Sequence, residues 1–158
     1  MPKQDFNINT GFAAAGDVYG LAFTNSQRFT YKAEAEMSAY ALAVVKGATS
    51  DTCKVGNSEG EILGITMRQN VLESRTRPGD GTITIPKGHP LAVMLEGPIN
   101  VVAKTAVAGE DVYINDSTGE IGGTAGTGYT KATNVKAIKY PVAAGDVFPV
   151  MVIMAAPK

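Results

Sequence analysis

His89 and Cys53 are the residues of this chain best suited to catalysis or metal binding, and each is the only one of its kind. A catalytic histidine serves a nucleophile or is oriented by a carboxylate, and the neighbours of His89, Gly88 and Pro90, offer no such pair. One histidine and one cysteine form a zinc site within one chain only with two further carboxylate or water ligands. We therefore expect a surface-loop histidine, no catalytic residue, no metal site and no cofactor.

Two turn-rich segments invite comparison with ligand-binding loops. The glycine-rich segment 119–128 lacks the Gly-Lys-Ser/Thr ending of a phosphate loop, and no helix pattern follows it. Asp116 stands in the turn sequence NDSTG, but the alternating ligands and the closing glutamate of a calcium loop are missing. We interpret both segments as turns or loops, and an enzyme is the least supported class of function.

Charge and apolar patterning also limit the possible partners. The net charge of −1 gives no bulk electrostatic reason to bind nucleic acid. The N-terminus MPKQDFNINT has no apolar run that would indicate a secretory signal. The longest apolar stretches, 39–45 and 147–156, are too short to span a bilayer. Since Cys53 is the single cysteine, no internal disulfide can form, and its alternating context predicts a buried, unreactive strand residue in a protein made in a reducing compartment.

Short strands joined by tight turns are indicated by the composition. The chain has 18 glycines, no tryptophan and 18% charged residues, and Ala, Val, Thr and Ile dominate the rest. A length of 158 residues fits one domain with an additional arm. We predict an all-β fold, a small β-barrel or β-sandwich formed by residues 31–158, preceded by an extended N-terminal arm at 1–30.

Alternating and apolar runs give the expected strands. Residues 31–38 alternate with period two, and the apolar run continues to residue 45. Residues 68–81 form a long polar loop, and 122–128 read as a flexible loop. The other expected strands are 52–55, 62–67, 82–85, 91–95, 99–103, 112–114, 120–121, 135–140 and 148–154.

The arm carries an unusual density of aromatic rings. Six of the eleven aromatic residues fall within the first 31 positions: Phe6, Phe12, Tyr19, Phe23, Phe29 and Tyr31. Disordered tails are normally poor in such rings, each of which can bury roughly 150–250 Å². We therefore expect the arm to lie on its own domain or on a neighbouring subunit, with Phe6, Phe12, Tyr19, Phe23 and Phe29 as interface candidates.

One short phrase occurs three times, as AGDVY at 15–19, AGEDVY at 108–113 and AGDVF at 144–148. Glycine supplies a positive φ, aspartate closes the turn through its own backbone, and valine and the aromatic residue start a strand. The unequal intervals and unmatched flanks favour reuse of one turn-to-strand device over an internal duplication.

Three of the four arginines lie in the long polar loop: Arg68, Arg75 and Arg77. Arginine is favoured at interfaces because its planar guanidinium binds carboxylates bidentately and stacks on rings. A solvated loop and a contact surface remain open alternatives. Binding of nucleic acid by these three residues is disfavoured because Glu73 and Asp80 interrupt the positive patch.

Several phrases together resemble the capsid cement, or head decoration, proteins of tailed bacteriophages, over roughly residues 10–155. They are the Gly-Asp-Val and Ser-Gln-Arg segments of the arm, the Ala/Glu-rich strand at 33–45, EILGIT at 61–66, GPINVVA at 97–103, AGEDVYI at 108–114 and TGEI at 118–121. The resemblance implies a small β-barrel or β-sandwich that binds the outside of the expanded capsid, often as trimers at three-fold positions, without catalysis.

The resemblance leads to the prediction of a virion structural protein on the capsid exterior, made in the host cytoplasm. Its expected partners are the major capsid protein and further copies of itself, with a trimer favoured, and neither nucleic acid nor membrane. Another phage structural protein, such as a tail, fibre or head–tail joining component, is the nearest alternative. A carbohydrate-binding β-sandwich is less well supported because tryptophan is absent and few aromatic residues lie outside the arm.

Overall fold

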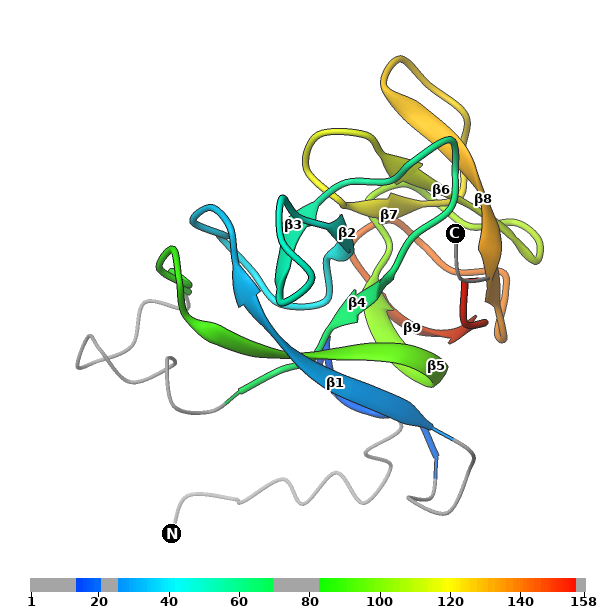
Figure 1. Ribbon diagram of the computed structural model, residues 1–158. Helices are drawn as coiled ribbons and strands as arrows, with labels where there is room; N and C mark the ends of the chain where they lie inside the picture. Colours follow the sequence, from blue (N-terminus) through cyan, green and yellow to red (C-terminus); the bar gives the residue numbers. More distant parts are fainter. Residues whose placement is uncertain (1–13, 21–25, 70–82, 156–158) are drawn as a thin grey trace, which may run out of the picture.

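Short runs of β-branched and small apolar residues, each ended by a turn, make up most of the chain and favour strands. The computed structural model describes residues 14–20, 26–69 and 83–155, and every regular element among them is a strand. The predicted all-β class is therefore confirmed. The strands (Figure 1) are β1 Gln27–Ala33, β2 Ala43–Lys46, β3 Thr52–Val55, β4 Gly64–Thr66, β5 Pro90–Val102, β6 Asp111–Asn115, β7 Ile121–Gly122, β8 Tyr129–Ala137 and β9 Val147–Val152.

The first five strands close into a small barrel. Their order is β1-β3-β2-β4-β5, and β1 pairs again with β5 to complete the ring. The β1–β3 pair is parallel, and the other neighbours are antiparallel. Of the two architectures predicted from the sequence, the structure has the barrel, with further strands added to it.

β5 belongs to both the barrel and a second sheet. Its residues 90–96 pair with β1, whereas residues 97–102 pair with β9. The two halves meet at Gly97, whose φ of +126° favours glycine; an added Cβ there would lie 2.9 Å from the Cβ of Ser26. Figure 1 shows this long strand running from the barrel toward the region of β9.

The second sheet has the order β5-β9-β8-β6-β7. An isolated parallel bridge between Ala103 and Ile121 brings β7 back beside the end of β5. The second sheet therefore begins at β5 and curls back to it, so that it nearly closes into a second barrel. The first barrel and the second sheet share β5.

Two hydrophobic clusters fill the fold. Leu91 and Val93 of β5 belong to the cluster inside the barrel, together with Ala33, Val44 and Cys53. The adjacent Met94 belongs to the other cluster, which the barrel shares with the second sheet. Side chains alternate between the two faces of a strand, so both faces of β5 are buried in its barrel half. The inner face of the second sheet contributes Ile99, Val101, Val112, Ile114, Val135, Phe148, Val150 and Val152.

The strand predicted from residue 31 to 45 is wrong in its bounds. β1 starts at Gln27 and ends at Ala33, and β2 starts at Ala43. The chain must leave the sheet between them, because β1 pairs with β3 and β5 while β2 pairs with β3 and β4. Residues 27–30, which the sequence analysis placed in the arm, form the first part of β1. The division into arm and domain stays a prediction, and residues 1–13 lie outside the described part.

Other predicted strands also differ from the structure: 62–67 and 148–154 are shorter, and in the described part of 82–85 Ile85 forms only an isolated bridge with Met37. The runs 91–95 and 99–103 were expected as separate strands around Glu96-Gly97-Pro98, but they form the continuous β5 because Gly97 accommodates the bend. The strand expected at 135–140 is β8, which already starts at Tyr129 because its first residues pair with β6. Long-range pairing decided both boundaries.

Candidate functional site

The described part of the arm lies on its own domain. The N–H of Gly16 donates to the carbonyl of Asn100 at 2.7 Å, and the N–H of Asn100 donates to the carbonyl of Asp17 at 2.9 Å. Tyr19 N–H donates to the carbonyl of Pro98 at 3.0 Å, and Val18 forms an antiparallel bridge with Ile99. Residues 16–19 thus pair, through an isolated bridge at Val18, with the edge of β5 that β9 does not occupy.

Two side chains fix this docked segment. Asn100 is buried, and its Nδ2 donates to the carbonyl of Asp17 at 3.1 Å. Arg68 donates its backbone N–H to the carbonyl of Gly16 at 3.0 Å, and its Nη1 lies 3.8 Å from the Asp17 carboxylate. The same carboxylate accepts the N–H of Ala14 at 3.1 Å. The turn that starts the segment is therefore held from the side of β4 as well as from β5.

The same turn occurs on the other edge of β5. The N–H of Gly145 donates to the carbonyl of Ala103 at 2.7 Å, and the N–H of Ala103 donates to the carbonyl of Asp146 at 2.9 Å. Gly16 and Gly145 have φ values of +89° and +90°. The predicted turn is confirmed in these two copies, and it leads into β9 after Gly145 and into the isolated bridge of Val18 with β5 after Gly16.

The predicted interface residues fall into two groups. Phe6, Phe12, Phe23, Arg75 and Arg77 lie outside the described residues. The other three, Tyr19, Phe29 and Arg68, can be placed.

Of the three that can be placed, Tyr19 and Arg68 both contact or belong to the docked segment. The ring of Tyr19 lies beneath the Nζ of Lys139, with 5.2 Å between Nζ and the ring centroid. Phe29 lies on β1 opposite Val93 and is 55% exposed. The structure therefore joins Tyr19 and Arg68 in one region and leaves Phe29 as a surface ring on the barrel.

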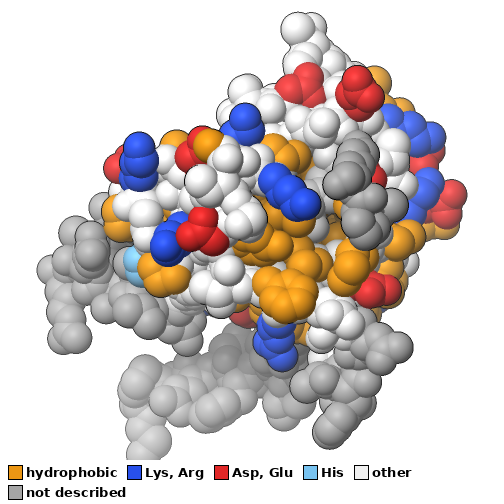
Figure 2. Space-filling model, in the orientation of Figure 1, with side chains coloured by type: hydrophobic (Ala, Val, Ile, Leu, Met, Phe, Trp, Pro, Cys, Tyr) orange, Lys and Arg blue, Asp and Glu red, His pale blue; other side chains and the backbone are white. Residues whose placement is uncertain are grey.

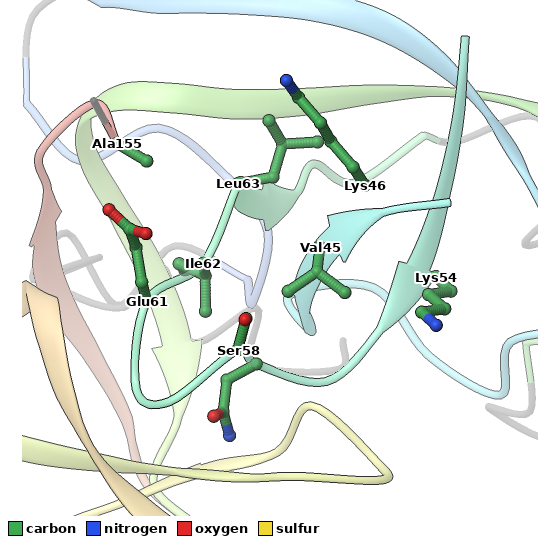
Figure 3. Close-up of a pocket in the computed structure, with 9 residues that line it drawn as sticks. Val45, Lys46, Lys54, Ser58, Glu61, Ile62, Leu63 and Ala155 are labelled. Atoms are coloured by element: carbon green, nitrogen blue, oxygen red, sulfur yellow. The ribbon is translucent and has the colours of Figure 1, made fainter. Parts of the chain in front are cut away.

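A pocket of about 390 Å³ opens beside the barrel (Figure 3). β2, β3, the segment before β4 and the end of the described chain contribute to it. Its lining comprises Val45, Lys46, Lys54, Asn57, Ser58, Glu61, Ile62, Leu63 and Ala155. Figure 3 shows Lys46 and Lys54 on the side of β2 and β3, and Glu61 near Ala155 on the opposite side.

The two lysines of this pocket differ from most other described lysines in their charge environment. Lys32, Lys104, Lys131 and Lys136 have carboxylate partners within 4 Å. Among the residues that the structure describes, Lys46 and Lys54 have no such partner. The pocket therefore presents two lysines without a close carboxylate beside apolar side chains, with Glu61 on its opposite side and a net positive lining.

Sequence reasoning missed this pocket, and no sequence signal marks it. Antiparallel pairing places Val45 opposite Lys54 and Lys46 opposite Cys53, so residues nine and seven positions apart become neighbours. The pocket also needs Ile62 and Ala155, which are distant in sequence. Figure 2 shows hydrophobic side chains gathered in the middle of the face that β1 and β4 cross, with Lys or Arg side chains around them.

The residues considered for chemistry are placed as follows. His89 Nε2 lies 3.3 Å from the side-chain oxygen of Gln69. Cys53 is fully buried, and burial raises the pKa of its thiol to about 11, with a smaller contribution from Glu34. In the described ranges, no three His, Cys, Asp or Glu side chains are grouped so that they could hold a metal ion. Of the same residues, none belongs to a helix long and apolar enough to cross a membrane.

Comparison with known proteins gives one family. A family model described as "Structural cement protein (E217 gp24/Pam3 gp6)" matches residues 1–153. No curated protein sequence matches the chain.

Two solved structures are similar in fold. A chain from the capsid of Myoviridae phage XM1 has 14% sequence identity and a TM-score of 0.64, with 88% of this chain and 89% of that chain covered. The N base of the head fibre gp8.5 of bacteriophage phi29 has 12% identity and a TM-score of 0.49, with 84% of this chain and 98% of that chain covered.

Proposed function

We propose that this chain, which belongs to the structural cement protein family of phages, binds the outside of the expanded capsid and stabilises the shell. Family membership makes it a structural protein associated with the phage capsid. The observation that carries the proposal is the match of the family model to residues 1–153, nearly the whole chain. Binding to the capsid exterior and stabilisation of the shell are the parts that we propose.

The proposed mechanism is mechanical. Each subunit spans the seam between neighbouring major capsid subunits, and apolar area buried there contributes roughly 25 cal/mol per Å² before the costs of association are deducted. Attachment at several points raises the overall avidity for the capsid, although each contact is weak individually. The exposed apolar surface and the pocket beside the barrel supply described contact regions for this role.

We also propose an oligomeric state for the protein and a function that requires no catalysis or cofactor. It self-associates, with a trimer favoured, is made in the host cytoplasm, and acts without catalysis, cofactor, metal, nucleic acid or membrane. The interface candidates of the arm and of the polar loop remain part of this proposal. For Arg68 the proposal is narrower, because Asp17 of the same chain already lies near its guanidinium.

Mixing the purified protein with undecorated expanded capsids tests the function. We expect co-sedimentation and a higher melting temperature for decorated than for bare shells. The double variant His89→Gln/Cys53→Ser should bind and stabilise shells as the unchanged protein does, because the proposed action is association. If the unchanged protein binds but does not raise the melting temperature, the cement role fails and a joining or fibre role takes its place.

A further inference from the structure

We propose that the pocket beside the barrel receives an acidic segment of the capsid shell that carries an apolar side chain. This inference rests on the proposed function and adds the contact site and the chemistry of the partner. The pocket combines an apolar hollow with two lysines that have no carboxylate within 4 Å in the described part of the chain.

Apolar side chains form the floor of the pocket. Val45 and Leu63 are half-buried, and Ile62 is buried between the barrel and the second sheet. Ile153 and Met154, which directly precede the lining residue Ala155 in the chain, are 53% and 41% exposed. A volume of about 390 Å³ falls within the range of pockets that bind a ligand or side chain.

The positive half comes from Lys46 and Lys54. Both are exposed, and the described part of the chain places no carboxylate within 4 Å of either ammonium group. The register sets Lys54 opposite Val45 and Lys46 opposite Cys53, so the two lysines leave the strand pair on opposite faces and border the pocket at separate points. A carboxylate of the partner would compensate them, and the apolar side chain beside it would fill the hollow. Charge complementarity therefore favours an acidic partner over a basic one.

The rigid setting of the pocket suits a docking site. Lys46 and Lys54 stand on paired strands of the closed barrel, and Ile62 is held by the side chain of Asn134 through both of its backbone groups. A partner would therefore meet a preformed surface, and little ordering of the cement subunit would be needed on binding.

The test compares two variants with the same change in net charge. Lys46→Ala/Lys54→Ala removes two positive charges from the pocket, and Lys87→Glu makes the same change at an exposed lysine in the turn before β5. Affinity for undecorated expanded capsids at low salt should fall about tenfold for the pocket variant and stay unchanged for the control. The pocket variant should also lose part of the salt dependence of binding, and all three proteins should melt at the same temperature in isolation.

A steric variant tests the apolar hollow independently of charge. Ala155→Phe fills the pocket from its edge and should weaken capsid binding while the isolated protein keeps its melting temperature. It also provides the test if the double lysine variant does not fold.

The remaining outcomes distinguish failure of the pocket inference alone from failure of the proposed function. Capsid affinities equal to that of the unchanged protein for both pocket variants would overturn the inference and leave the cement role standing. Loss of self-association in sedimentation velocity with unchanged capsid binding would assign the pocket to a second copy, which also overturns it. If the unchanged protein does not bind capsids at all, the proposed function and the inference fail together.

Discussion

The side-chain amide of Asn134 hydrogen bonds to both backbone polar groups of Ile62. Its Oδ1 accepts the N–H of Ile62 at 3.1 Å, and its Nδ2 donates to the carbonyl of Ile62 at 2.9 Å. The same Nδ2 donates to the carbonyl of Ile153 at 2.9 Å. Asn134 is buried, so these bonds replace strand pairing where the segment before β4, β8 and the end of β9 meet.

Asn134→Ala should therefore destabilise the protein markedly. The substitution leaves buried backbone groups of Ile62 without partners, and each such group costs about 1–3 kcal/mol. We expect the free energy of unfolding to fall by about 2–3 kcal/mol in urea titrations. Asn115→Ala is the matched control, because the half-buried Asn115 side chain accepts bonds within its own turn, from Ser117 and Thr118. Equal losses for the two variants would contradict the role given to Asn134.

The three copies of the repeated phrase allow a graded glycine series. Gly109 lacks a positive φ and has open space around it, so Gly109→Ala should leave stability unchanged or slightly raised. Gly145 has φ +90° and no atom near an added Cβ, so Gly145→Ala should cost about 1–2 kcal/mol of strain alone. At Gly16 an added Cβ would also lie 2.7 Å from the backbone nitrogen of Arg68.

Gly16→Ala should therefore release the docked segment as well as strain it. We expect faster hydrogen exchange at the Tyr19 amide, which donates to Pro98, with little change at the amides of the barrel. The measurement is amide exchange followed residue by residue, with Gly109→Ala as the reference. Unchanged exchange at Tyr19 would show that the segment does not depend on this glycine.

Two truncations should separate the arm from the fold. Removal of residues 1–13 leaves the docked segment and all nine described strands intact, so the melting temperature should stay near that of the full chain. Removal of residues 1–30 also deletes residues 27–30 of β1 and most of its pairing with β5, and the closed barrel should lose stability strongly. Thermal unfolding by circular dichroism measures both. A 1–30 truncation that melts like the full chain would place the arm boundary at residue 30 after all.

Stability above about pH 9 should depend on Cys53. Burial raises the pKa of its thiol from the ordinary value of 9.0 to about 11, so the unfolded chain releases this proton before the native protein does. The native state is then favoured fully below pH 9, and this contribution decreases as the pH rises toward 11. Cys53→Ala removes the effect, and its stability should fall less steeply between these pH values. Parallel slopes in urea titrations of both proteins would contradict the assignment.

Local patterns in the sequence predicted those features that short segments determine on their own. The AGD phrases fix turns at Gly16 and Gly145 because a positive φ and the following strand are encoded within five residues. The apolar runs on either side of Gly97 predicted strand structure correctly, yet not its continuity. The shared use of β5 by two sheets depends on pairing between distant segments, which alternation within one segment does not report.

The pocket illustrates the same limit for the candidate site. Lys46 and Lys54 carry no motif, and they become a site only when β2 and β3 pair and Ile62 and Ala155 close the hollow. The aromatic and arginine residues that composition singled out were visible because their types are unusual. Residues of ordinary type acquire a role through the surface that they share, and that surface exists only in the folded chain.

The passage of β5 through both sheets determines how the domain carries load. A pull on one sheet reaches the other along the backbone of β5, because residues 90–96 pair with β1 and residues 97–102 pair with β9. Strands beside β5 lie along it and would be pulled in shear, so many hydrogen bonds must give way at once instead of opening one after another. In the proposed role at a shell seam, a subunit of this design would transmit strain along β5 as a stiff tie.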